Sequence, residues 1–462
     1  MRKKRSRKKG KGLAILIGAL IFTAIASGAL GYLYTSDKKS KDTINEEVYI
    51  DNINVGGKKL SEAEELLKNK YGEGIGAKAI QVKGNKSYTL DYSKLEVKYN
   101  IDKTVEDALS YGKSNNIFEN YKNRKTGERK DFKLELSYNS GAVDEFINMI
   151  EKDENKTGLD AKISITNGSV KVTPEVDDTR LEKDKLREAV IDEIKEVGSK
   201  DAAVINAPLD VKKPAITSEK LNAINSCISS FNTSFATSIP NRINNIELAV
   251  KAINGTLLMP GESFSFNGIV GERTKESGYK EAGVIMGDKI ESGLGGGICQ
   301  VSSTLYNAVL TANLKIEERR NHTLPLAYVS MGLDATVDFG NIDFKFKNIL
   351  DTPIYIEGYT KNKSVYFNIY SNSELTKRTY KMYPEIYETV QAAMKYIYDP
   401  SKDEGYTEVI KKPSNGYRVK VYRKAYENGS VITTEQISND YYSAVDGETI
   451  RGTKKAVDNT LQ

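Results

Sequence analysis

The residues in this chain that are best suited to chemistry lie in a glycine-rich stretch that contains a cysteine. The stretch reads Gly293-Leu294-Gly295-Gly296-Gly297-Ile298-Cys299-Gln300, and apolar residues at helical spacing follow it. This pattern predicts a glycine turn that leads into a helix with Cys299 at its start. The N-terminal end of a helix carries partial positive charge and free N–H groups, which stabilise a thiolate and lower its pKa. The N–H groups of the glycines could also form an oxyanion hole.

The only histidine of the chain, His322, lies a short distance beyond this stretch, in Arg319-Arg320-Asn321-His322. A helix of about 15 residues followed by a strand would bring the imidazole back beside the thiol. A cysteine and histidine in contact form a nucleophile with its base, and a third group usually orients the imidazole. Asp334 and Asp338 are the nearest acids, and Asn321 is a weaker choice. In an extended chain the two aspartates would face the same side.

Each of these residues also has a structural interpretation. A lone cysteine in a helix is most often a buried apolar residue. The alternative for His322 is a purely structural role as a hydrogen-bonding residue. The second cysteine, Cys227, falls in a helix predicted over residues 221–229, where it is either a small buried residue or a disulfide partner of Cys299. A glycine run alone can bind phosphate, but the chain has neither a Gly-x-x-x-x-Gly-Lys-Ser/Thr motif nor a Gly-x-Ser-x-Gly elbow.

The composition limits the alternatives further. The chain has 462 residues, with two Cys and one His. One histidine excludes a His-rich zinc or haem site within one chain, and two cysteines exclude a disulfide scaffold. We therefore expect no metal and no cofactor. The hydrophobic fraction of 39% and the charged fraction of 28% favour a folded body of two to four domains.

The net charge of +5 arises from the N-terminus, because residues 1–11 carry eight Lys and Arg, and removing these eight leaves −3 for the rest. Residues 12–34 have no charged side chain and are long enough to span a bilayer. The flanking positive charge predicts a cytoplasmic basic tail, a single-pass transmembrane helix in the cell membrane and an extracytoplasmic body. The alternative is a signal peptide cleaved after Ala24-Ile25-Ala26. A nucleic-acid partner for the tail is disfavoured by this apolar stretch.

The remaining chain predicts an α+β, multidomain protein. Residues 35–47 form a linker, and residues 48–207 alternate short strands with helices over 59–71, with Ser61 as N-cap, 104–111 and 181–197. A loose repeat divides 48–207 into two α+β units near residue 130. Residues 208–229 are a linker and helix, residues 230–350 hold the glycine run and the histidine, and 351–379 are a β extension. The predicted C-terminal β module covers 380–455, with a hairpin at Glu427-Asn428-Gly429.

Residues 230–350 resemble the VanW domain, a family named for an accessory protein of vancomycin-resistance clusters. The matching motifs are Phe231-Asn232-Thr233-Ser234-Phe235, Arg242-Ile243-Asn244-Asn245-Ile246, Met259-Pro260-Gly261-Glu262-Ser263-Phe264-Ser265-Phe266-Asn267, Gly295-Gly296-Gly297-Ile298-Cys299-Gln300-Val301-Ser302-Ser303-Thr304-Leu305-Tyr306-Asn307, Arg319-Arg320-Asn321-His322 and Gly332-Leu333-Asp334-Ala335-Thr336-Val337. Residues 48–207 resemble the peptidoglycan-binding domain often found upstream of VanW. Residues 380–455 resemble a β module of the five-glycine type, with Gly447-Glu448-Thr449-Ile450-Arg451-Gly452 as its motif.

This resemblance implies an L,D-transpeptidase that crosslinks peptidoglycan stem peptides through a thioester, with Cys299 on the family's cysteine position and His322 as the base. The catalytic residues that we expect are Cys299, His322, Asp334 and Asp338. The oxyanion and substrate-binding residues that we expect are Gly296, Gly297, Ile298, Gln300 and Arg320. Two alternatives remain open, namely a non-catalytic cell-wall binding or scaffold protein and a cysteine peptidase of the same stem peptides. The partners are stem peptides and the membrane, and the oligomeric state is left open.

Overall fold

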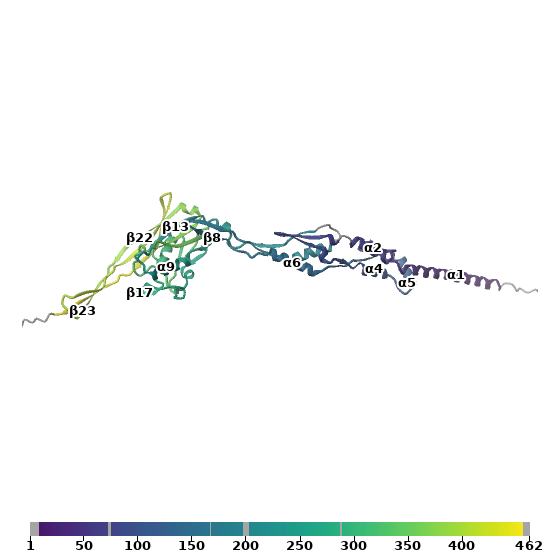
Figure 1. Cartoon of the computed structure of the whole chain (residues 1–462), viewed down its shortest axis with the longest axis horizontal. Coiled ribbons are helices and arrows are strands. Elements are labelled where there is room, and N and C mark those ends of the chain that lie inside the picture. The colour runs from purple at the N-terminus through teal and green to yellow at the C-terminus, as the bar shows by residue number, and fades with distance from the viewer. Residues whose placement is uncertain (1–8, 73–74, 167, 197–202, 287–288, 456–462) are drawn as a thin grey trace, which may run out of the picture. The chain divides into compact units, whose positions relative to one another are not determined.

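A computed structural model describes residues 9–72, 75–166, 168–196, 203–286 and 289–455. The chain divides into two compact units, one of residues 1–158 and 177–212, the other of residues 159–176 and 213–462. Both units mix helices with strands, so the expected α+β class is confirmed, together with an N-terminal apolar helix and a β-rich C-terminal region (Figure 1).

The elements of the first unit alternate short strands with helices. They are α1 Lys9–Ser40, β1 Val48–Ile50, β2 Ile53–Asn54, α2 Leu60–Tyr71, η1 Ile75–Ala77, β3 Ala79–Lys83, β4 Ser87–Asp91, α3 Tyr92–Leu95, β5 Lys98–Tyr99, α4 Ile101–Ser110, α5 Ile117–Lys125, β6 Lys130–Phe132, β7 Leu136–Ser137, α6 Ser140–Glu154, β10 Asp178–Leu181, α7 Lys183–Lys195, β11 Ala203–Asn206 and β12 Leu209–Lys212. The three predicted helices correspond to α2, α4 and α7. Ser61 is not the N-cap of α2, because the helix already begins at Leu60, where the Glu62 carboxylate accepts from the Lys59 N–H at 2.9 Å.

Helix α1 is longer than the predicted apolar segment. Its stretch Ile15–Ser40 has a mean hydropathy of 2.0 and qualifies by length and composition as a membrane span, as a signal sequence also would. The predicted linker at 35–47 therefore begins as helix. Asp37 in this last part is buried and accepts a 2.9 Å hydrogen bond from the Asn120 side chain of α5, which holds the end of α1 against the unit.

The first unit contains two hydrophobic cores whose residues interleave along the chain. One core joins β1, α2 and α4 around residues such as Ile50, Leu67 and Val105. The other joins β3 and β4 to α6 and α7 around Ile80 and Ile147. Because β3 and β4 precede residue 130 but pack with helices that follow it, a single division near residue 130 does not describe this packing.

The elements of the second unit include one largely buried helix and several small sheets. They are β8 Lys162–Thr166, β9 Ser169–Thr173, α8 Ser218–Leu221, β13 Ser226–Ser234, α9 Pro240–Ile253, β14 Thr256–Leu258, β15 Ser263–Ser265, α10 Phe266–Val270, β16 Glu281–Met286, β17 Lys289–Leu294, α11 Ile298–Thr311, β18 Lys315–Glu318, β19 Lys345–Lys347, β20 Ile354–Lys361, β21 Ser364–Ser371, η2 Ser373–Lys377, β22 Arg378–Val390, β23 Met394–Asp403, β24 Thr407–Lys411, β25 Gly416–Glu427, β26 Ser430–Tyr442 and β27 Gly447–Lys454. The hairpin predicted at residues 427–429 joins β25 to β26.

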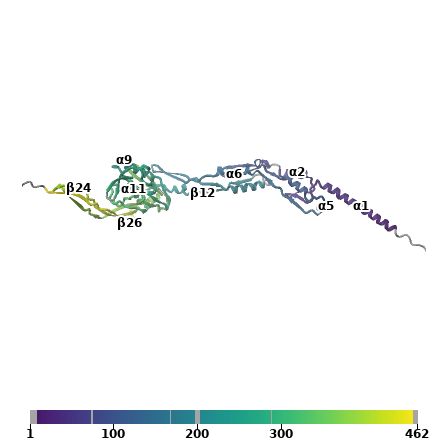
Figure 2. The same ribbon diagram turned by 90° about the horizontal axis from the view of Figure 1, so that it is seen from below.

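Helix α11 lies at the centre of the core of this unit, and α9 packs beside it (Figure 2). Helix α11 packs against the sheet of order β13-β21-β20-β14, in which Phe231 of β13 lies opposite Phe367 of β21. Met382 of β22 and Ile437 of β26 pack against the same core. The C-terminal strands therefore complete the core that surrounds the predicted cysteine helix.

The helix predicted over residues 221–229 is wrong. Only Ser218–Leu221 is helical, and Cys227 lies in β13, opposite Tyr370. The buried positions Ser229 and Thr233 face α11 with polar side chains that donate or share hydrogen bonds with Ala308 and Thr304, at 2.7 and 2.8 Å. Because these inward residues are small and polar, the strand lacks the apolar alternation that would identify it in the sequence.

Candidate functional site

The site is built on the glycine turn that begins α11. Gly297 precedes the first residue of the helix with a φ of 107°, a left-handed conformation that favours glycine. A Cβ at Gly296 would lie 2.7 Å from the Gly283 carbonyl oxygen, so β16 approaches the turn too closely for a larger residue. Cys299 follows as the second residue of α11 and is partly exposed. The predicted cysteine at a helix N-terminus is thus confirmed.

The histidine returns to the cysteine by the route that the sequence predicts, through a helix and then strand β18. His322 is 6% exposed, and its Nδ1 lies 2.6 Å from Oδ2 of Asp334, which is 1% exposed. The same carboxylate oxygen accepts from the His322 backbone N–H at 2.6 Å. With Nδ1 turned to the carboxylate, Nε2 is the ring nitrogen that remains for the thiol.

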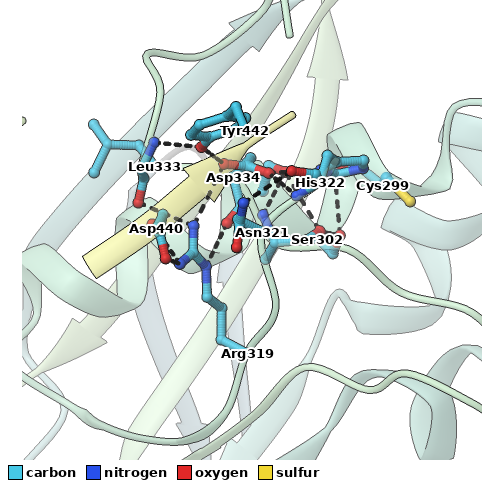
Figure 3. Close-up of polar contacts among 12 residues, drawn as sticks. Cys299, Ser302, Arg319, Asn321, His322, Leu333, Asp334, Asp440 and Tyr442 are labelled. Carbon is cyan, nitrogen blue, oxygen red and sulfur yellow. Dashed lines mark hydrogen bonds and ion pairs between the residues drawn. The ribbon is translucent and has the colours of Figure 1, made fainter. Parts of the chain in front are cut away.

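Asp334 is held by residues from two distant parts of the chain (Figure 3). The hydroxyl of Tyr442, at the end of β26, donates to Oδ1 at 2.5 Å. Arg319 lies 3.4 Å from the same oxygen, and its guanidinium also donates to both carboxylate oxygens of Asp440 at 2.6 and 2.7 Å. A buried carboxylate with this many donors stays ionised. The C-terminal strands therefore supply part of the support for the imidazole.

The segment that carries Asp334 is fastened to α11 close to the cysteine. Ser302 donates to the Ala335 carbonyl at 2.6 Å, and the Ala335 N–H donates to the Ser303 hydroxyl at 3.0 Å. The thiol itself lies 3.5 Å from the Val337 carbonyl oxygen. These contacts fix the relative positions of the nucleophile and the carboxylate.

The pKa shifts in this group point in consistent directions. Burial lowers the pKa of His322, but hydrogen bonds with Asp334 and Cys299 and the charges of both groups raise it to about 9. Burial raises the pKa of Cys299, and the hydrogen bond and charge of His322 together with Arg273 bring it below its ordinary value. Burial raises the pKa of Asp334, but His322, Arg319 and Tyr442 lower it overall. Together these directions favour a thiolate–imidazolium pair beside an ionised carboxylate.

Several predicted site residues lie elsewhere. Asp338 is exposed and accepts from the Asn341 side chain at 2.7 Å, within the turn that the bridge between Asp338 and Ile342 closes. Asn321 does not contact the imidazole but donates to the carbonyl oxygens of His322 and Tyr441, both at 2.9 Å. The side chain of Arg320 is exposed, and its neighbour Arg319 is the one that reaches the site.

Two of the predicted oxyanion residues are already engaged. The N–H groups of Ile298 and Gln300 donate to the carbonyls of Gly295 and Gly297 at 3.1 Å each. The Gln300 side chain is buried and donates to Thr233 and to the Ser234 carbonyl at 3.0 and 2.8 Å. In the described part of the chain, no backbone acceptor is bonded to the N–H groups of Gly296, Gly297 or Cys299. These three are the donors that remain for an oxyanion.

The two cysteines do not form a disulfide. Both are free, and Cys227 lies on a strand with its thiol 3.3 Å from the Ser229 carbonyl oxygen. Within the described ranges, no group of three or more His, Cys, Asp or Glu side chains is placed to hold a metal ion.

Sequence reasoning missed the residues that support the carboxylate, namely Arg319, Asp440 and Tyr442. Arg319 is adjacent in sequence to a predicted residue, and the run of two arginines offered no way to choose between them. Asp440 and Tyr442 lie in the C-terminal strands, whose tyrosine-rich pattern is that of an ordinary half-buried β surface. No local signal in the sequence joins these residues to Asp334.

Comparisons with known families match three parts of the chain. Residues 241–370, a segment that contains Cys299, His322 and Asp334, match the family described as VanW like protein. Residues 88–203 match the family described as "Putative peptidoglycan binding domain". Residues 385–454 match the G5 domain, which contains Tyr442 and Asp440. The resemblances noted in the sequence to these three families are therefore confirmed at the level of the family match.

Two curated relatives extend this similarity. The chain is 42% identical over 170 residues to the uncharacterized protein YoaR of Bacillus subtilis (strain 168), which covers 37% of this chain and 56% of the relative. It is 36% identical over 116 residues to the vancomycin B-type resistance protein VanW of Enterococcus faecalis (strain ATCC 700802 / V583), covering 24% of this chain and 42% of the relative. The chain thus spans about half the length of the curated relatives it matches.

One solved structure, the IgA1 protease G5 domain, matches 17% of this chain and 92% of its own length at 19% identity. Its TM-score of 0.14 is too low to support a conclusion about fold or function.

Proposed function

We propose that this chain is a membrane-anchored cysteine L,D-transpeptidase that crosslinks peptidoglycan stem peptides outside the cytoplasm. The observation that carries the proposal is the Cys299–His322–Asp334 arrangement, with the thiol at a helix N-terminus and the imidazole fixed at 2.6 Å from a buried carboxylate. The family matches to VanW like protein, to a peptidoglycan binding domain and to G5 support the cell wall as the place of action.

The first half of the reaction is acyl transfer to the enzyme. The Cys299 thiolate attacks the carbonyl carbon of the third residue of a donor stem, and free N–H groups at Gly296, Gly297 and Cys299 hold the oxyanion. The His322 imidazolium gives its Nε2 proton to the leaving amine as the C–N bond breaks. The products are free D-alanine, a thioester on Cys299 and a neutral imidazole.

The second half returns the enzyme to its starting state. The side-chain amine of a neighbouring stem attacks the thioester while His322 takes the proton that the amine loses. The C–S bond then breaks, leaving the crosslinked peptide and the thiolate–imidazolium pair. Asp334 stabilises the imidazolium and keeps Nδ1 as its donor throughout, because it accepts from that nitrogen at 2.6 Å.

The remaining parts of the chain receive roles in the same proposal. Helix α1 anchors the protein, and the basic residues before it stay on the cytoplasmic side. The region 48–207 and the C-terminal module 380–455 contact the cell wall, while 230–350 carries the reaction. Support for these roles comes from the apolar helix and from the two flanking family matches.

The test uses the full chain in detergent micelles with a disaccharide-tetrapeptide muropeptide. We expect a crosslinked dimer and free D-alanine by mass spectrometry. The matched controls are Cys299→Ala, which should give neither product, and Cys227→Ala, which should be fully active. Release of D-alanine without a dimer would indicate a peptidase, and absence of both products from folded protein would indicate a binding or scaffold protein.

A further inference from the structure

Two arginines that the proposed reaction does not use flank the glycine turn. Arg242 lies on α9, and Arg273 lies in the segment after α10. A Cβ at Gly297 would lie 2.9 Å from Cγ of Arg242, and a Cβ at Gly295 would lie 3.0 Å from Cγ of Arg273. The aliphatic stems of both arginines therefore pack against the turn that precedes Cys299, one on each of two glycines that lie two residues apart.

Arg273 has an unused donor. Its Nη1 donates to the Asn267 side chain at 2.7 Å, but its buried Nη2 has no hydrogen-bond partner in the described part of the structure. The guanidinium carbon lies 5.6 Å from the ring centre of Phe266 and 5.9 Å from that of Phe339. These rings restrict the guanidinium, so a ligand that satisfies Nη2 would bind to a largely preformed donor.

Neither arginine is neutralised by an acid at contact distance. In the described ranges, the side-chain hydrogen bonds of the two arginines go to neutral groups, from Arg242 Nη1 to the Ser238 hydroxyl and from Arg273 Nη1 to the Asn267 amide oxygen, both at 2.7 Å. Burial lowers the pKa of both arginines, and the charge of Cys299 raises it in each case. Asp343 and Asp338 act on Arg273 more weakly. The thiol thus interacts with two partly buried cations that have no carboxylate at contact distance among the described residues, which is a suitable environment for an anion.

We propose that Arg273, assisted by Arg242, binds the free carboxylate of the amino acid released from the acyl donor. This inference rests on the proposed function. In a donor whose terminal residue leaves, the carboxylate carbon lies within about 4 Å of the scissile carbonyl carbon, the spacing of one residue. A carboxylate receptor must therefore lie close to the nucleophile, and the stems of these arginines pack on Gly295 and Gly297 of the turn that leads directly to Cys299. The donor is then restricted to peptides that end one residue beyond the scissile bond.

The site can be tested without any peptidoglycan by comparing two alkylating agents on the full chain in detergent, in a Cys227→Ala background. Iodoacetate carries the carboxylate, and iodoacetamide is its neutral counterpart. We measure the rate constant for iodoacetate at Cys299 divided by that for iodoacetamide. This ratio should fall about tenfold in Arg273→Gln, because one charge-assisted contact is lost, and should fall less in Arg242→Gln. Both reagents react with the same thiolate, so the ratio does not depend on the fraction of Cys299 that is ionised. The charge of His322, which is present in every variant, does not affect the comparison between variants.

Two further variants keep the test decisive. Arg320→Gln removes an exposed arginine from the same unit and should leave the ratio unchanged. Arg273→Lys keeps the charge without the planar fork and should restore only part of the preference. Thermal melting confirms that each variant is folded. An equal ratio in wild type, Arg273→Gln and Arg242→Gln would overturn the inference.

The peptide donors then separate this inference from the proposed reaction. We expect D-alanine release from a tetrapeptide stem but at least tenfold slower reaction of the same peptide with a C-terminal amide. If acid and amide peptides react at equal rates and iodoacetate is not preferred, the arginines do not bind a carboxylate, and the proposed transpeptidase reaction stands without them. A clear iodoacetate preference without any activity on stem peptides would leave the anion site and reject the proposed reaction.

Discussion

The two cysteines of the second unit have the same side chain and opposite environments. Cys299 begins a helix beside His322 and Arg273, and its pKa is lowered in spite of burial. Cys227 lies on strand β13, where partial burial of the thiol and the charge of Glu357 raise its pKa. The comparison indicates that a nearby base and cation, as at Cys299, set the direction in which the pKa of a buried thiol moves.

The strongest test of this comparison replaces each of the two cysteines in turn with alanine. We expect Cys299→Ala to lower D-alanine release by about 10⁴-fold or more, because no other group can form the thioester. Cys227→Ala should change the rate by less than about twofold. The measurement is initial velocity on tetrapeptide muropeptide. Equal activities for the two variants would show that the environment around Cys299 serves another purpose.

The carboxylate provides a second test. Asp334→Asn should lower the rate by about 10³- to 10⁴-fold, because an amide cannot stabilise the imidazolium and favours the wrong imidazole tautomer. Asp338→Asn, its exposed counterpart, should retain wild-type activity. The pH profile of Cys299 alkylation distinguishes a loss of orientation from unfolding, since the His322 pKa should fall well below about 9 in folded Asp334→Asn.

The pH dependence should differ between the two thiols. Because the pKa of Cys299 is lowered, its thiolate forms below the pH at which an ordinary thiol ionises, and because that of His322 is raised to about 9, the imidazolium persists to about pH 9. D-alanine release should therefore fall above about pH 9, as the proton for the leaving amine is lost. Iodoacetamide should label Cys299 at neutral pH and Cys227 only in more alkaline solution. Identical labelling profiles would contradict the environments described.

The smallest expected effect concerns Tyr442, which supports the surroundings of Cys299 through Asp334 and does not support those of Cys227. Tyr442→Phe removes the hydroxyl that donates to Asp334 at 2.5 Å and accepts from the Gly332 N–H at 2.6 Å. We expect about tenfold slower turnover and about 1–3 kcal/mol lower stability in a denaturant titration. Tyr441→Phe, at the exposed neighbouring position, should change stability by less than about 0.5 kcal/mol. The labelling of Cys227 should be unaffected.

The sequence was informative where chemistry and local structure coincide. The glycine run predicted the turn and the helix start because consecutive glycines readily adopt positive φ and seldom continue a helix, and the helix-strand route correctly returned His322 to Cys299. The choice between Asp334 and Asp338 depended on which carboxylate reaches the imidazole, and the assumption of an extended chain ignored the turn signal Gly340-Asn341 that follows Asp338. The helix predicted over residues 221–229 is wrong where it overlaps the start of β13, because the inward Ser229 is polar and donates to the Ala308 carbonyl of α11. The supports from β26 are tertiary contacts, for which a single sequence holds no local signal.

The link between Asp334 and β26 has a consequence for the timing of activation during synthesis. Tyr442 and Asp440, on β26, follow Cys299 by more than a hundred residues, so the cysteine is synthesised first. Until β26 docks, Asp334 lacks its tyrosine donor and Arg319 lacks Asp440, and the carboxylate that orients His322 is incompletely held. If Cys299 acts as proposed, the imidazole beside it is therefore fully supported only once the C-terminal strands have folded.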